Sequence, residues 1–199
     1  VNLCGANLTG ADLSGAVLRS AYYDEKTIWP KDFDPTNTRL HYIGPNADLY
    51  EADLANISLT GCNLQGANLK GANLRNSDLS GTNLFGAIYD DHTKWPYEFD
   101  YVNCGAIGPK ANLEGKDLSG FNLQEAELDG ANLRNANLSG CNLRLTELRE
   151  VDLRGADLSG AYLFKTCLSS SRLNGADLRG TFMHKVNFNE VIFSGAKVD

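Results

Sequence analysis

The sequence predicts an all-β solenoid, a fold in which very short strands wind into stacked coils. A leucine or another large apolar residue, the centre of each unit, recurs every five residues in 32 units. A small residue stands two positions before the centre in 25 of these units, and 17 of the 20 glycines stand two positions after one. A period of five fits neither an α-helix nor a long alternating strand, so the repeat itself specifies the architecture.

Each unit is expected to form one straight segment and one corner. The small residue and the centre are two positions apart, so both point to the same face of an extended chain. The other residues, which usually end in glycine, turn the chain. Burying one leucine and one alanine gives only ~3 kcal/mol, whereas ordering a residue costs roughly 1.5 kcal/mol. A single unit is therefore unstable, and successive coils must stack to share a leucine core and backbone hydrogen bonds.

The units fall into three arrays, at residues 1–23, 47–89 and 111–199, separated by connector loops at 24–46 and 90–110. The connectors are copies of each other: Ala21–Asp34 and Ala87–Asp100 are identical at 8 of 14 positions and share the pattern T-x-W-P-x-x-F-D. Their large apolar residues predict loops that pack against the coils. Asp34 followed by Pro35 is typical of the start of a short helix. We expect one continuous solenoid domain.

The tandem pattern A-(D/N)-L-x-G, as in Ala11–Gly15 and Ala156–Gly160, resembles the pentapeptide repeat protein family. The T-x-W-P-x-x-F-D insertions are similar to those of its cyanobacterial members. This resemblance implies a right-handed quadrilateral parallel β-helix in which four units make one coil. The 32 units would then build about eight coils.

Composition excludes several classes of function. A net charge of −7 argues against direct nucleic-acid binding, which needs clustered Lys and Arg. No apolar run approaches the length that spans a membrane. Five cysteines at irregular spacing, with no C-x-x-C pair, indicate neither a disulfide framework nor a metal site, and no cofactor is expected. We expect a cytoplasmic protein, or one of the thylakoid lumen or periplasm if a leader has been removed.

No motif of an enzyme occurs. The nucleophile elbow, the zinc-protease pattern, the phosphate loop and the dinucleotide fingerprint are all missing from the sequence, and His41, His92 and His184 are isolated. A core filled with leucine also leaves no cleft. The sequence therefore predicts a non-enzymatic protein without catalytic residues. A hydrolase or transferase would require a concave polar pocket beside a connector.

The family resemblance supplies a second candidate function, because some members confer quinolone resistance by imitating DNA on gyrase. Such a mimic of DNA for gyrase or topoisomerase needs one sign of charge along a face. Residues 110–199 instead hold 11 Lys and Arg against 12 Asp and Glu, with opposite charges alternating at 20-residue spacing, as in Asp129 and Arg149. The local acidity gathers in the second connector, where four carboxylates face only Lys94. A structural rod that binds an unidentified protein partner is the main prediction.

Five aromatic residues are candidates for partner binding. Tyr162 and Phe182 precede their centres and are 20 residues apart, so they should stack on an outer face, with Phe164 nearby. Trp29 and Trp95 belong to the connectors, where packing within the loop is the simpler interpretation and a ligand platform the alternative.

The last centres and two cysteines carry further predictions. Beyond residue 182 the centres change to other apolar types, which indicates an open coil end and predicts a homodimer or end-to-end association through the C-terminal coils. Cys62 and Cys141 occupy the small position and should be buried thiols.

Overall fold

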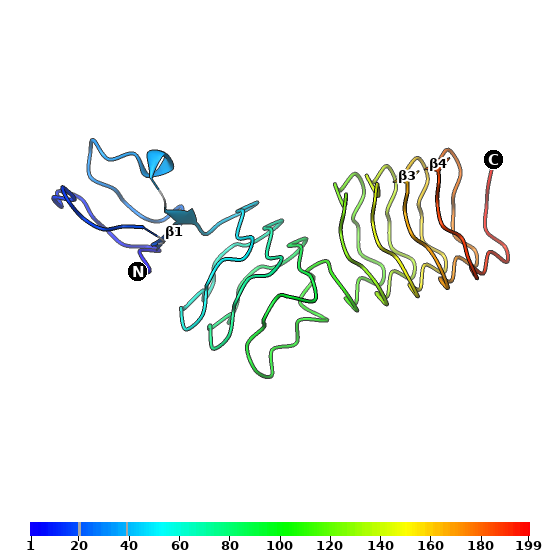
Figure 1. The fold of residues 1–199 in the computed structure, drawn as a ribbon, viewed down its shortest axis with the longest axis horizontal. Coiled ribbons are helices and arrows are strands. Elements are labelled where there is room, and N and C mark those ends of the chain that lie inside the picture. The colour runs from blue at the N-terminus through cyan, green and yellow to red at the C-terminus, as the bar shows by residue number, and fades with distance from the viewer. Residues whose placement is uncertain (20, 39) are drawn as a thin grey trace.

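The structure, a computed structural model, describes residues 1–19, 21–38 and 40–199. The chain forms an elongated stack of coils with its two ends far apart (Figure 1). Along the third array, from Asn112 to Asp177, each residue that precedes a centre pairs in parallel with the residue 20 positions later, as in Asn112 with Asn132 and Asn132 with Asp152. A turn of 20 residues holds four units, so the coarse prediction of a parallel β-solenoid built from five-residue repeats is confirmed.

Strands are very short because two of every five residues turn a corner. The continuous strands are β1 (Tyr22–Tyr23), β2 (His41–Tyr42), β3 (Tyr162–Phe164) and β4 (Phe182–His184). β1 pairs with β2 and β3 pairs with β4, both in parallel. Most other units contribute single bridges. One short 3₁₀ helix, η1 (Pro35–Asn37), begins after Asp34, whose side chain accepts a hydrogen bond from the Thr36 N–H; the predicted helix start is confirmed.

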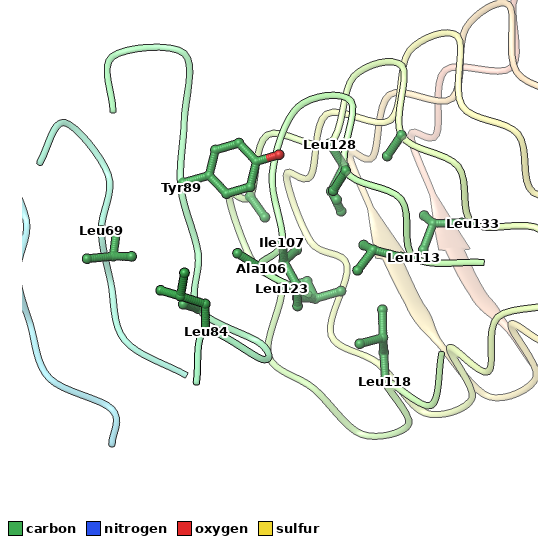
Figure 2. Packing of buried hydrophobic residues seen from close by; sticks show 14 of the residues in the cluster. Leu69, Leu84, Tyr89, Ala106, Ile107, Leu113, Leu118, Leu123, Leu128 and Leu133 are labelled. Atoms are coloured by element: carbon green, nitrogen blue, oxygen red, sulfur yellow. The ribbon is translucent and has the colours of Figure 1, made fainter. Parts of the chain in front are cut away.

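The interior is a continuous column of leucine side chains. Every leucine centre from Leu49 to Leu178 is buried, and Figure 2 shows the leucines of successive coils gathered inside the turns. The leucines of the first array are only half-buried, so the predicted leucine core is incomplete there. Within the described part of that array, bridges form at Asn2, Asn7 and β1, whereas the units of Leu13 and Leu18 form none.

Small residues beside the core carry a second role that size alone does not explain. The Thr146 and Thr166 hydroxyls donate to the carbonyls of the centres 23 residues earlier, at 2.8 and 2.6 Å. The Cys141 thiol is buried and makes the same contact with Leu118. Cys62 is only half-buried, which corrects the prediction for that residue: it borders a recess beside the first connector.

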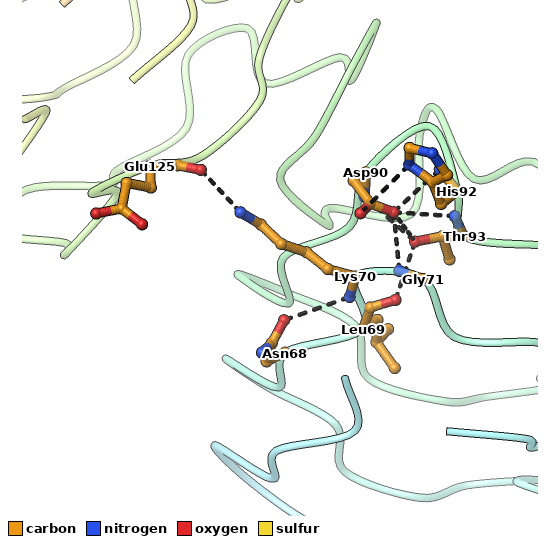
Figure 3. Close-up of polar contacts among 8 residues, drawn as sticks. All are labelled: Asn68, Leu69, Lys70, Gly71, Asp90, His92, Thr93 and Glu125. Carbon is orange, nitrogen blue, oxygen red and sulfur yellow. Dashed lines mark hydrogen bonds and ion pairs between the residues drawn. The ribbon is translucent and has the colours of Figure 1, made fainter. Parts of the chain in front are cut away.

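The duplicated connectors follow the same path through the coils. Ile28 bridges to Asn7, and Lys94 bridges to Asn73, each 21 residues apart. In each copy an aspartate replaces the backbone carbonyl that normally accepts from a corner glycine: Gly5 N–H donates to Asp24 at 2.7 Å, and Gly71 N–H donates to Asp90 at 2.8 Å. Figure 3 shows Asp90 at this position.

The second and third arrays meet at a break in the bridge pattern. The ladder of the second array reaches Ile107, and a new one begins at Asn112, whose N–H donates to the Val102 carbonyl. Side chains cross this junction: the Lys70 ammonium donates to the Glu125 carbonyl at 2.7 Å (Figure 3). Phe121, too large for its small position, instead packs edge-on against Phe85.

Candidate aromatic interaction face

One outer column of the third array changes from amides to aromatic rings. In its first coils, Asn142 donates its side-chain amide to Asn122 at 2.8 Å, as asparagines do along most of the stack. The next positions in the same column are Tyr162 and Phe182, whose rings stack with their centroids 4.8 Å apart and their planes 9° apart. They are 48% and 61% exposed. The predicted stacking of these two residues is confirmed.

A second column, on the other side of the same centres, is also aromatic. Phe164 and His184 stack at 5.5 Å with planes 5° apart. The Arg144 guanidinium lies 5.2 Å from the centre of the Phe164 ring, close enough for a cation–π contact. Phe164 therefore lies between a cation and an imidazole in its column.

The two columns enclose a shallow groove over β3 and β4. Its lining is Arg144, Tyr162, Phe164, Thr181, Phe182, Met183 and His184. We call this set the aromatic face. Because side chains before and after a centre point outward, the fold places both columns on one surface of the rod. An exposed group of large apolar side chains of this kind is typical of an interaction site.

The corner beside the aromatic face lacks glycine. Elsewhere in the third array most corners carry glycine with positive φ, but the column next to the face holds Glu125, Leu145, Lys165 and Lys185, with φ between 54° and 58°. A side chain in the left-handed region costs about 1–2 kcal/mol. Glycine would leave this border without side chains, whereas the four strained corners place a side chain at each step along it.

The aromatic face is bordered by cations that have no acidic partner. Among the described residues, no ion pair forms at Arg144, Lys165 or Lys185, and all three are exposed. The Lys165 ammonium lies 5.5 Å from the Phe164 ring centre. The positive charge at this border is therefore available to a ligand.

Three other arginines of the third array, Arg149, Arg154 and Arg179, pair with aspartates. Arg149 contacts Asp129 at 2.9 Å across one coil, which confirms the predicted alternation of charge at that pair. Arg179 contacts Asp177 at 2.6 Å, and its hydrogen bond holds the pKa of that carboxyl well below the usual range.

Both connector tryptophans pack within their own loops and not at the aromatic face. Trp29 stacks on Phe33 at 4.8 Å. Trp95 stacks on Phe99 and Tyr101 at 5.4 and 5.8 Å. The Trp95 indole N–H is buried and has no hydrogen-bond partner within the described part of the chain.

Titratable groups elsewhere offer little reactive chemistry. Burial raises the pKa of the Cys141 thiol to about 11. Burial and the nearby Asp24 and Cys62 raise the pKa of the Cys4 thiol to about 12. Both thiols are therefore protonated at neutral pH. Across residues 1–19, 21–38 and 40–199 no group of three His, Cys, Asp or Glu side chains is arranged to hold a metal ion.

Within those same ranges, no helix has the length and apolar character needed to cross a bilayer.

Tyr162, Phe164 and Phe182 of the aromatic face were expected from the sequence, but the residues around them were not. Arg144 and His184 share the column of Phe164 at 20-residue spacing, and this could have been read from the repeat register. The run of corners without glycine was a second available signal. Thr181 and Met183, the small residue and the centre of the Phe182 unit, also line the groove, where Met183 is 39% exposed.

Comparison with known proteins identifies the repeat. The sequence profile described as pentapeptide repeats matches in eight copies, over residues 1–22, 46–88, 110–140, 126–164 and 166–199. No curated protein sequence matches the chain.

Several solved structures are similar. A pentapeptide repeat protein from the thylakoid lumen of Arabidopsis thaliana is 34% identical, over 43% of this chain and 63% of its own length, with a TM-score of 0.30. Rfr23 from the cyanobacterium Cyanothece is 22% identical over 100% of this chain and 87% of that one, with a TM-score of 0.34. HetL from the cyanobacterium Nostoc, described as involved in regulating heterocyst differentiation, is 28% identical over 98% and 86%, with a TM-score of 0.32. Since the profile matches well over half of the residues, the chain belongs to the pentapeptide repeat family.

Proposed function

We propose that this repeat protein is a non-enzymatic interaction rod whose aromatic face binds a protein partner. The observation that carries the proposal is the replacement of an asparagine ladder by the exposed stack of Tyr162 on Phe182. Aromatic side chains bring large contact area and lose little conformational freedom, so they dominate binding energy at interfaces. The leucine core fixes the spacing of the two rings before any partner arrives.

The proposal includes the finer description of the fold. A right-handed quadrilateral helix of about eight coils, interrupted by two connectors within one solenoid, is supported by the 20-residue register and the 32 units. The absence of enzymatic activity is also part of the proposal. Its support is that the core is filled by leucine and that array carboxylates such as Asp157 and Asp152 bind corner N–H groups or form ion pairs.

Cytoplasmic location is proposed from the unpaired cysteines, with the thylakoid lumen or periplasm as the alternative. All five cysteines are free thiols. Fractionation of the source cells, followed by detection of the protein in each fraction, tests this part of the proposal.

Capture from an extract of the source cells tests partner binding. Wild type and the double variant Tyr162→Asn, Phe182→Asn are immobilised side by side; the variant restores the asparagine ladder and should keep the fold. We expect a partner on wild type that is lost on the variant. Trp29→Ala is a matched aromatic control and should retain the partner, since Trp29 packs on Phe33. Equal capture by the wild type and the double variant would overturn the proposal.

Mimicry of DNA at gyrase is the second candidate, and the charges of the third array do not favour it. Arg149, Arg154 and Arg179 neutralise aspartates along the rod. A supercoiling assay with purified gyrase separates the two candidates. Inhibition, or protection from a quinolone, at low micromolar protein would favour the mimic.

A further inference from the structure

We infer that the aromatic face of one copy receives the second connector of another copy of this chain. The inference rests on the proposed function and names an occupant for the same face. It is carried by complementary surfaces within one sequence: a groove with aromatic walls and unpaired cations, and a rigid loop with an exposed aromatic side chain and unpaired carboxylates.

The second connector presents one aromatic side chain to solvent. Tyr97 is 90% exposed, whereas the other aromatic residues of the loop, Trp95, Phe99 and Tyr101, are partly buried. Its neighbour Trp95 stacks on Phe99 and Tyr101, and the Tyr101 ring is almost parallel to that of Trp95, at 4°. The stack therefore holds the loop in shape and projects Tyr97 from it. A preorganised aromatic anchor loses little freedom on binding, which favours affinity.

The base of the loop is also fixed. Asp90 accepts hydrogen bonds from the backbone N–H groups of Gly71, His92 and Thr93 and from the Thr93 hydroxyl (Figure 3). The Thr93 hydroxyl oxygen also lies 2.9 Å from the Leu69 carbonyl oxygen, so its single proton is shared between that carbonyl and Asp90. These contacts tie the loop to the preceding coil.

The charges of the two surfaces are opposite. Asp91, Glu98 and Asp100 are exposed around Tyr97, and within the described chain none of them forms an ion pair. Arg144, Lys165 and Lys185 border the groove, as described above. Opposite charges at the rim of a contact speed its formation and orient it, while buried aromatic side chains supply most of the affinity.

The two surfaces cannot meet within one molecule. The second connector projects from the lower side of the stack in Figure 1, whereas β3 and β4 lie at the upper side, several coils away. Contact between them must therefore join two copies. In the inferred contact Tyr97, the exposed ring of the acidic loop, enters the groove between the two columns.

The first connector provides a natural control. In the alignment of the two copies, Lys31 stands where the second connector has Tyr97, while tryptophan, proline and phenylalanine are kept around it. The first connector thus has the same scaffold with a cation at its tip. It should not enter a groove bordered by cations.

Sedimentation velocity of the full chain tests the inference. Wild type should self-associate between about 5 and 500 µM, and more weakly at 300 mM than at 50 mM salt, because salt screens the rim charges. Tyr97→Lys should weaken association at least about tenfold, as expected for loss of an anchor residue. Lys31→Tyr is the control and should leave association at its wild-type strength or increase it. Circular dichroism confirms that each variant is folded.

Charge reversal makes the test specific. One variant carries Lys165→Glu and Lys185→Glu, and the other carries Asp91→Lys and Glu98→Lys. Each alone should be monomeric, and mixing them should restore association. A wild type that stays monomeric at 500 µM, or variants that associate as wild type does, would overturn the inference. The proposed function fails separately, when the Tyr162→Asn, Phe182→Asn variant still captures its partner from extract.

Discussion

The backbone N–H of Gly71 donates to the carboxylate of Asp90 at 2.8 Å, at a corner where the regular repeat uses a backbone carbonyl 19 residues later. At the preceding corner, Gly66 donates to the Phe85 carbonyl in the regular way. The connector departs from the repeat after Tyr89, so the aspartate side chain takes the place of a carbonyl that the backbone no longer supplies. Asp199 makes the same contact with Gly180 at 2.6 Å.

Asp90→Ala should lower the free energy of unfolding by about 1–2 kcal/mol, the usual cost of losing a side chain that caps several backbone donors. Denaturation in guanidinium chloride, followed by circular dichroism, measures the change. Asp91→Ala is the matched control and should have no effect, because Asp91 is exposed. Faster hydrogen exchange at the Gly71 amide in Asp90→Ala would locate the loss. Equal stability of the two variants would contradict the account.

Thr166→Val should destabilise the protein by about 1–2 kcal/mol although the two side chains have the same shape. The Thr166 hydroxyl is fully buried and donates to the Leu143 carbonyl at 2.6 Å, which valine cannot do. Thr166→Ser keeps the donor and loses one methyl group, so it measures packing alone. Thermal unfolding of the three proteins separates the two contributions. If valine were as stable as threonine, small size alone would explain the residue at this position.

Lys165→Gly should stabilise the fold by about 0.5–1 kcal/mol, because glycine adopts the positive φ of this corner without strain. The same change should weaken binding at the aromatic face, since it removes a cation from the border. Glu150→Gly is the control: Glu150 has φ 56° at a corner away from the face, so the variant should gain stability and keep binding. Chemical denaturation and sedimentation velocity measure the two effects. Full binding by Lys165→Gly would show that the strained corner serves another purpose.

Stability should decline in acid and not between pH 5 and 7. Hydrogen bonds from Arg179 and Arg154 hold the pKa values of Asp177 and Asp152 below their usual range, although burial acts in the opposite direction. A carboxyl whose pKa is lowered in the folded state stabilises the fold fully above its unfolded pKa of about 4, and that contribution is lost as the pH falls through the folded value.

Melting temperatures from pH 7 down to pH 2 measure this dependence. The melting temperature should be nearly constant to about pH 5 and fall below about pH 4. Arg179→Gln should make the decline shallower, because the pKa of Asp177 then returns toward its usual value. A melting temperature that rises on acidification would contradict the assignment.

The architecture could be predicted from the sequence because it depends on side-chain size at fixed spacing. Leucine centres, small neighbours and corner glycines define the register, and the register places Tyr162 above Phe182 without further information. The pairing of Asp129 with Arg149 follows in the same way. These contacts join residues one coil apart, so a local period is enough to specify them.

Other features depend on contacts that the period does not encode. The partial exposure of Leu13 and Leu18 reflects how many coils stack on them, which no single unit records. The capping of Gly71 by Asp90 arises where the repeat is interrupted. The contact of Lys70 with the Glu125 carbonyl joins two arrays across a break in the bridges. The cationic border was present in the sequence, but only the geometry shows that Lys165 lies against Phe164.

Site-specific photocrosslinking tests the central claim, that the aromatic face is where the protein binds its partner. A benzophenone amino acid is placed at Phe182 and, as a control, at Asn122, which lies in the same column three coils earlier and belongs to the asparagine ladder. We expect strong crosslinks to a protein from Phe182 and few from Asn122. Equal crosslinking from both positions, or crosslinks from Asn122 alone, would contradict it.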